Sequence, residues 1–149
     1  MHILIAPNAF KNSLTASDAA KAICKGLQDG GLTGRFESFP VGDGGDGTAS
    51  LIVQRMGGFF MDVYASDPLG RKVKSSIGFI DDGSTAVIEM ADISGLKLLK
   101  QKELDPLHAT SFGCGELIRA ALNRRVRKII LGIGGSATID GGSGALQAL

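Results

Sequence analysis

The sequence predicts an α/β protein, a parallel sheet with helices joined to part of a smaller mixed α/β domain. Near both ends of the chain, short apolar segments are followed by a glycine-bearing loop and then by helical spacing, which favours parallel βα units. In the middle, apolar segments follow one another through short turns, which favours antiparallel or mixed pairing. We therefore assign residues 1–57 and 105–149 to a discontinuous, Rossmann-like domain and residues 58–104 to the second domain.

The first region contains two strand-loop-helix units. Residues 2–6 are an apolar run that predicts a strand. A helix follows it, with Thr15 as N-cap and Asp18 as the acid of a shortened capping box. Residues 36–41 predict the next strand, and the loop 42–48 then leads into a short helix.

The middle region predicts strands at 59–65, 73–79 and 85–90, with turns at 67–70 and 81–84. A helix that Thr110 or Ser111 can cap is then expected to run to about residue 123.

The last strand is expected at 128–131 and leads into the loop 132–144. We place the strands 2–6, 36–41 and 128–131 in one parallel sheet, whose carboxyl ends would bring their loops to a common edge. The final six residues predict a helix that the chain does not complete, so we expect the chain to be a fragment of a longer protein.

The composition excludes several functional classes. The 149 residues carry 16 basic and 15 acidic side chains, a net charge of +1 that gives no electrostatic case for binding nucleic acid or a membrane. No segment approaches the roughly 20 apolar residues of a membrane span. Cys24 and Cys114 have no metal-binding spacing. We therefore expect a cytoplasmic protein that acts on a small molecule.

The loop 132–144 is the strongest functional signal. It holds six glycines in thirteen residues after an apolar strand. Glycine lets backbone amides approach a ligand closely, and a strand leading through such a loop into a helix favours an anion such as phosphate. Ser136 and Thr138 can donate hydroxyls to phosphate, and Asp140 can hold Mg²⁺ or orient a hydroxyl. The main-chain phosphate contacts are expected at Gly134, Gly135, Gly141 and Gly142.

The other two loops supply charged candidates. The Lys11 ammonium can neutralise a phosphate or a carboxylate. Asp43 and Asp46 can bind Mg²⁺, or one of them can take a proton from a substrate hydroxyl. Alternatively, Asp46 caps the next helix while Asp43 stabilises the turn. Glu89 is either a metal ligand or an exposed carboxylate at a strand end.

These motifs together resemble the glycerate kinase family of the bacterial type that phosphorylates glycerate with ATP. The resemblance covers nearly the whole chain and rests on six segments in matching order: APNAFKNSLTA at 6–16, DGGDGT at 43–48, DPLG at 67–70, EMADISGL at 89–96, TSFGCGELI at 110–118 and GIGGSATIDGGSGALQAL at 132–149. The chain departs from the family pattern at Asn8, Ala9, Asn12, Asp46 and Ile139.

The resemblance implies an ATP- and Mg²⁺-dependent kinase of two α/β domains, longer than this chain, with the site in the cleft between them. It implies that Lys11 and the loop 132–144 hold anionic groups and that Asp43 or Asp46 serves as base or metal ligand, with Asp140 as a further metal ligand. Arg71 is then a candidate for the glycerate carboxylate. The missing part of the fold predicts that the isolated chain is inactive. The alternative is a non-catalytic or different Rossmann-like nucleotide-binding fragment.

Overall fold

The computed structural model describes residues 1–11 and 13–149, so that Asn12 of the first predicted loop lies outside the described residues. The chain divides into two compact units, residues 1–43 and 44–149, and each unit is described by itself. The predicted domains, 1–57 with 105–149 and 58–104, do not share this boundary and stay a prediction.

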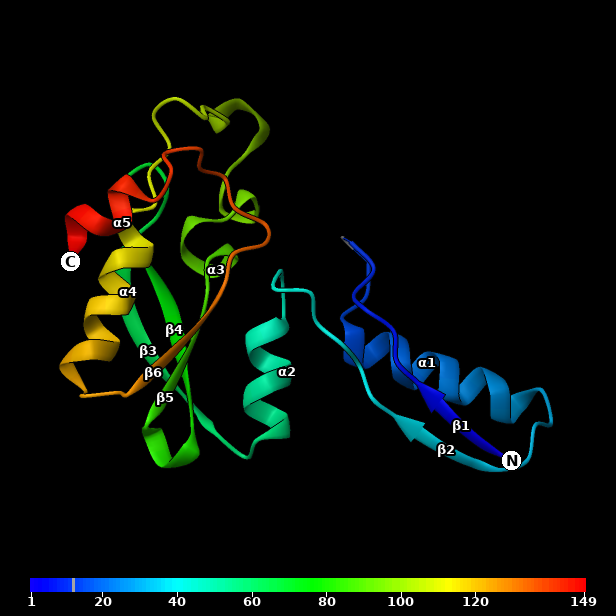
Figure 1. The fold of residues 1–149 in the computed structure, drawn as a ribbon. Helices are drawn as coiled ribbons and strands as arrows, with labels where there is room; N and C mark the ends of the chain where they lie inside the picture. The colour runs from blue at the N-terminus through cyan, green and yellow to red at the C-terminus, as the bar shows by residue number, and fades with distance from the viewer. Residues whose placement is uncertain (12) are drawn as a thin grey trace. The chain divides into compact units, whose positions relative to one another are not determined.

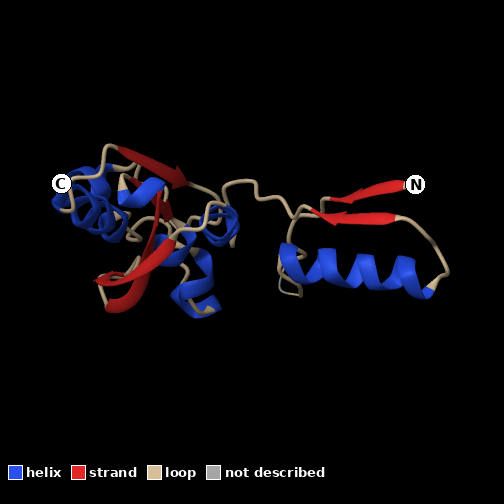
Figure 2. Cartoon of the chain, turned by 90° about the horizontal axis from the view of Figure 1, so that it is seen from below, coloured by secondary structure: helices blue, strands red, loops and turns tan. Residues whose placement is uncertain are grey.

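The first unit is a single βαβ arrangement. Strands β1 (His2–Ile5) and β2 (Arg35–Ser38) pair in parallel, and helix α1 (Ala16–Asp29) connects them. Figure 2 shows α1 running along one face of the two strands. Thr15 caps α1 as predicted: its Oγ1 accepts a hydrogen bond from the backbone N–H of Asp18 at 3.1 Å and donates one to the Asp18 carboxylate at 2.8 Å.

The second unit contains a four-stranded mixed sheet in the order β3-β4-β5-β6. Its strands are β3 (Phe59–Ser66), β4 (Lys72–Ile80), β5 (Thr85–Glu89) and β6 (Lys128–Gly132). The pairs β3–β4 and β4–β5 are antiparallel, which confirms the predicted meander, and β5 and β6 are parallel.

The predicted single sheet of segments 2–6, 36–41 and 128–131 is wrong. Strand β6 pairs with β5 of the second unit, whereas β1 pairs with β2. The reason is that helix α4 (Phe112–Asn123) is the crossover between β5 and β6, so that these two strands form a parallel βαβ unit of their own. Periodicity identified β6 as a strand, but it carries no information on which strand lies beside it.

Helices cover both faces of this sheet (Figure 1). On one face, α4 buries Cys114 and Leu117 against Ile77, Phe79 and other sheet residues. On the other face, α2 (Thr48–Arg55) packs its buried Val53 on the sheet. A Cβ atom at Gly78 would lie 2.3 Å from Val53 Cγ2, so glycine is required for α2 to pack this closely.

Short helical segments complete the second unit. They are η1 (Asp81–Gly83), α3 (Ala91–Ser94), η2 (Leu96–Leu98), η3 (Gln101–Glu103) and α5 (Ser143–Ala148). The predicted α/β class is confirmed, with parallel pairing in both sheets. Among the described residues, the helices lack the combination of length and apolar character that crossing a membrane requires.

Candidate functional site

Two glycine-rich loops of the second unit meet at the carboxyl ends of β5 and β6. The parallel register places Glu89 opposite Gly132, so both strands end at the same edge. Beyond that edge, the N–H of Gly134 donates to the carbonyl of Gly44 at 2.8 Å. A Cβ atom at Gly134 would lie 2.7 Å from the Cα of Gly45. Glycine at position 134 therefore lets the loop after β6 lie directly against the loop before α2.

Past this contact, the loop presents two hydroxyls from a fixed backbone. Ser136 Oγ and Thr138 Oγ1 lie 2.9 Å apart, and the backbone N–H of Thr138 donates to Ser136 Oγ at 3.1 Å. The Gly135 carbonyl accepts a hydrogen bond from the backbone N–H of Leu96, and the Ala137 N–H donates one to the Ser94 carbonyl. Both hydroxyl residues are half-buried, so part of each side chain stays accessible to a ligand.

Asp46 brings a carboxylate to the same place. A Cβ atom at Gly135 would lie 3.6 Å from Asp46 Oδ2, which puts that carboxylate beside the loop after β6. Lys97 Nζ forms ion pairs with Asp46 at 2.7 Å and with Asp92 at 2.6 Å. Burial works to lower the pKa of Lys97, but its hydrogen bonds to the two carboxylates prevail and the pKa is raised. The ammonium therefore stays charged and neutralises part of the acidic cluster.

Glu89 is the buried member of that cluster. One ligand oxygen from each of Asp46, Glu89 and Asp92 lies within 4.8 Å of the others, which suits a hard cation. Glu89 is 2% exposed, so the alternative of an exposed strand-end carboxylate is wrong. Its two oxygens accept hydrogen bonds from the N–H groups of Gly47 at 2.7 Å and Ala49 at 2.9 Å.

Asp140 has protein partners on both of its oxygens. Oδ2 accepts hydrogen bonds from the backbone N–H and the hydroxyl of Ser111, both at 2.8 Å, and from the N–H of Gly144 at 3.2 Å. Oδ1 accepts from the N–H of Gly142 at 3.0 Å. Burial favours the neutral acid, but these hydrogen bonds outweigh it and lower the pKa of Asp140. The carboxylate therefore ties the loop to the starts of α4 and α5.

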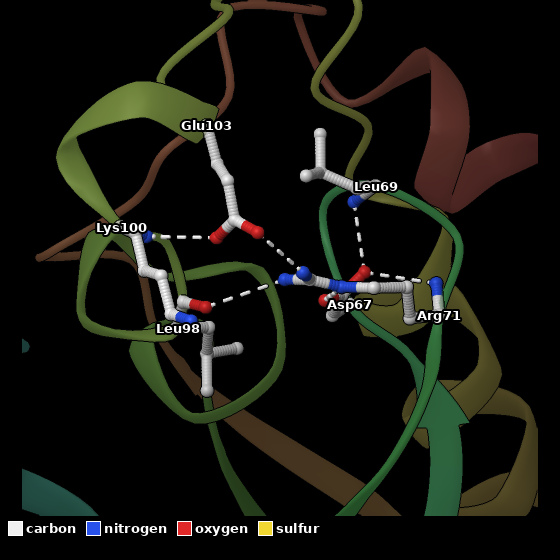
Figure 3. Close-up of polar contacts among 6 residues, drawn as sticks. All are labelled: Asp67, Leu69, Arg71, Leu98, Lys100 and Glu103. Atoms are coloured by element: carbon white, nitrogen blue, oxygen red, sulfur yellow. Dashed lines mark hydrogen bonds and ion pairs between the residues drawn. The ribbon is translucent and has the colours of Figure 1, made fainter.

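Arg71 is likewise engaged by protein groups (Figure 3). Its guanidinium forms ion pairs with Asp67 and with Glu103, and it donates a long hydrogen bond to the Leu98 carbonyl. Asp67 is 1% exposed and also accepts hydrogen bonds from the backbone N–H groups of Leu69 and Arg71, both at 2.9 Å. Arg71 therefore fastens the β3–β4 turn to the segment 98–103.

The remaining predicted residues belong to the first unit. Asp43 Oδ2 accepts a hydrogen bond from Asn8 Nδ2 at 3.0 Å, which joins the loop after β1 to the start of the second predicted loop. Lys11 is exposed in the turn before α1. The structure thus brings Asp46 together with the loop 132–144, and it brings Asp43 together with the loop after β1.

From the sequence, Glu89 had two alternative roles, and Asp92 and Lys97 were not predicted as site residues. A signal for Glu89 and Asp92 was present: Glu89 is the last residue of a buried strand and Asp92 comes three residues later, at the sheet edge where ligands bind in α/β folds. Lys97 carried no such signal, because its ion pairs depend on how the segments η2 and α3 fold back toward the loop before α2.

Comparisons with known proteins agree on one family. A family model described as "Glycerate kinase family" matches residues 3–149. The chain is 48% identical to a glycerate 2-kinase of Escherichia coli (strain K12) and 46% identical to a glycerate kinase of Bacillus subtilis (strain 168), in each case over 100% of this chain and 39% of the relative. A crystal structure assigned to glycerate kinase 2 of Salmonella typhimurium LT2 is 44% identical, with a TM-score of 0.80 over 100% of this chain and 40% of that one. The chain thus spans about two fifths of the length of these relatives.

Proposed function

The chain belongs to the glycerate kinase family, and from this premise we propose that the complete protein transfers the terminal phosphoryl group of ATP to a hydroxyl of glycerate. The observation that carries the proposal within this chain is the meeting of the two glycine-rich loops, with Gly134 N–H on the Gly44 carbonyl at 2.8 Å. This meeting gathers main-chain groups, two hydroxyls and a carboxylate at one sheet edge. Phosphoryl transfer requires such positioning and charge neutralisation more than covalent chemistry.

The loop after β6 is proposed to hold the phosphates of ATP. The hydroxyls of Ser136 and Thr138 point from one fixed turn and can donate to phosphate oxygens. Gly135 stays a proposed main-chain contact for phosphate. At Gly134 the N–H already donates to the Gly44 carbonyl, and the absence of a Cβ atom makes room for Gly45. Gly141 and Gly142, with φ of 61° and 81°, shape the turn into α5 and allow Asp140 to reach back into the loop.

Asp46 is proposed as the group next to the reacting hydroxyl. As a base it would accept the proton of that hydroxyl while the hydroxyl oxygen bonds to the terminal phosphorus and ADP leaves. As a metal ligand it would hold Mg²⁺, which when bound neutralises phosphate charge; Asp43 is the second proposed residue for either role. The acidic cluster around Asp46 fits a hard cation, with Lys97 as its present counter-charge.

Lys11 is proposed to neutralise an anionic group of either substrate. Asp140 and Arg71 were predicted as ligands of the metal and of glycerate respectively. Their protein partners instead favour positioning roles, in which Asp140 shapes the phosphate loop and Arg71 fastens the β3–β4 turn.

An ADP-release assay on the complete protein tests this function. We expect ADP release to depend on glycerate and to be far slower with other hydroxy acids. The D46N variant should lose about 100-fold or more in rate, within the range that general acid–base catalysis supplies. Absence of glycerate-dependent ADP release by the wild-type protein would contradict the proposal.

A further inference from the structure

Glu89 is the buried member of the acidic cluster, and both of its carboxylate oxygens accept hydrogen bonds from backbone N–H groups. It ends β5 and is 2% exposed. Burial raises its pKa, and the hydrogen bonds from Ala49 and Gly47 offset only part of that rise. Burying a carboxylate is unfavourable unless hydrogen bonds compensate for the loss of solvation. Here the backbone N–H groups of Gly47 and Ala49 supply these hydrogen bonds.

Those partners belong to the start of α2. The N-cap of that helix is Gly47, in the left-handed conformation with φ of 86°, and glycine has no side chain with which to cap a helix. Glu89, 42 residues away in sequence, replaces the missing cap: one oxygen accepts from Gly47 at 2.7 Å and the other from Ala49 at 2.9 Å. Its negative charge also suits the positive end of the helix dipole.

Asp46 lies between this cap and the loop contact. The residue before it, Gly45, packs against Gly134, and the residue after it, Gly47, is held by Glu89. Lys97 holds the Asp46 side chain itself, through an ion pair at 2.7 Å. Since glycines flank Asp46 on both sides, the sequence alone leaves this segment free to take many conformations.

We propose that Glu89 is the positioning residue that holds Asp46 in place, acting through the backbone N–H groups of Gly47 and Ala49. The start of α2 is thereby closed to phosphate, because a carboxylate of the chain already occupies it. The role of Asp46 rests on the proposed function, whereas the tether between Glu89 and α2 does not.

A double-mutant cycle in the complete protein tests the proposal. E89Q keeps the shape of the side chain but presents an NH₂ group to one of the two N–H donors. We expect E89Q to lower kcat by about tenfold to 100-fold, with less than about threefold change in KM for ATP and glycerate. In the D46N background, E89Q should have no further effect on kcat, since its effect passes through Asp46. Independent, multiplying losses would overturn the proposal. E37Q, the same change at an exposed carboxylate paired with His2, is the matched control and should leave kcat unchanged.

Amide hydrogen exchange provides a readout that does not depend on turnover. E89Q should lose protection at Gly47 and Ala49 by tenfold or more, with the sheet amides of β4 and β5 unchanged; D46N should keep that protection. If E89Q does not fold, E89D retains the charge but is one methylene too short to reach both amides, and it should lose protection at one of them. Unchanged protection at both amides would overturn the tether. Absence of turnover in the wild-type protein would overturn the proposed function instead, with the exchange result still deciding the tether.

Discussion

The two glycine-rich loops that meet at the sheet edge use their acidic residues in opposite ways. In the loop before α2, the carboxylate of Asp46 forms an ion pair with Lys97. The helix α2 is capped by Glu89 of β5 instead. In the loop after β6, the carboxylate of Asp140 accepts hydrogen bonds from the starts of α4 and α5, while the half-buried hydroxyls of Ser136 and Thr138 lie 2.9 Å apart within the loop. An acidic residue in a glycine-rich loop is therefore not a ligand by composition alone; the backbone donors within its reach determine its role.

Substitution of Asp140 and of Asp46 should have different effects on the free energy of unfolding. D140N should lower the free energy of unfolding by about 3 kcal/mol, because several hydrogen bonds to a charged acceptor are lost and an NH₂ group faces backbone donors. D46N should change it by less than about 0.5 kcal/mol, as is usual for exposed sites. Urea denaturation of both variants measures the difference. Equal effects on stability would contradict the comparison.

The close approach that Asp140 enforces can be tested at Gly144. A Cβ atom there would lie 2.2 Å from Thr110 Oγ1 and 2.8 Å from Asp140 Oδ2. G144A should therefore cost about 2 kcal/mol of stability through overpacking. G26A is the control: Gly26 lies within α1, and no neighbouring atom of the described residues comes within 4 Å of the place a Cβ would take. Alanine there should be neutral or stabilising. A stable G144A protein would show that the loop is not held tightly against α4.

Asp67 should make stability depend on pH. Like Asp140, it is a carboxylate that accepts hydrogen bonds from backbone amides of its own loop. Burial opposes ionisation, yet hydrogen bonds from Arg71 and Leu69 lower the pKa of Asp67. Its contribution to stability is therefore complete above the unfolded-state pKa of about 3.9 and is lost as the pH falls through the lower folded-state value. D67N should be about 2 kcal/mol less stable than wild type near pH 7. Urea denaturation at pH 7 and pH 3 should show this gap narrowing in acid; a gap that widens in acid would contradict the assignment.

The hydroxyls of Ser136 and Thr138 should contribute to ATP binding and little to the free energy of unfolding. S136A and T138A each remove one member of a half-buried pair whose other contacts lie within the same loop. We expect each to raise KM for ATP several-fold, about 1 kcal/mol of binding free energy, while the free energy of unfolding changes by less than about 0.5 kcal/mol. Steady-state kinetics and urea denaturation on the same preparations measure both. A loss of stability without a change in KM would make the pair structural.

The sequence predicted those elements that depend on interactions between residues a few positions apart. The cap of α1 by Thr15, the β3–β4–β5 meander and the strand β6 were all predicted, because capping residues and alternation of apolar side chains act over a few positions. The pairing of β6 with β5 was not predicted, because which strands pair depends on how the helices pack on the sheet. In the candidate site, the glycines of residues 132–144 correctly predicted a loop after β6, which contains Ser136 and Thr138. The hydrogen bonds of Asp140 and the ion pairs of Lys97 were not predicted, because they depend on donors and acceptors brought near by the fold.

In the proposed reaction, the loop after β6 binds the phosphates of ATP, and Asp46 rather than Asp140 lies beside the reacting groups. A crystal structure of the complete protein with Mg²⁺ and a non-hydrolysable ATP analogue tests it most directly. We predict the terminal phosphates against residues 134–138, the Asp46 carboxylate beside them, and Asp140 still bonded to Ser111. Phosphates bound away from this loop, or Asp140 released from Ser111 to hold the metal, would contradict these roles of the loop and of Asp46.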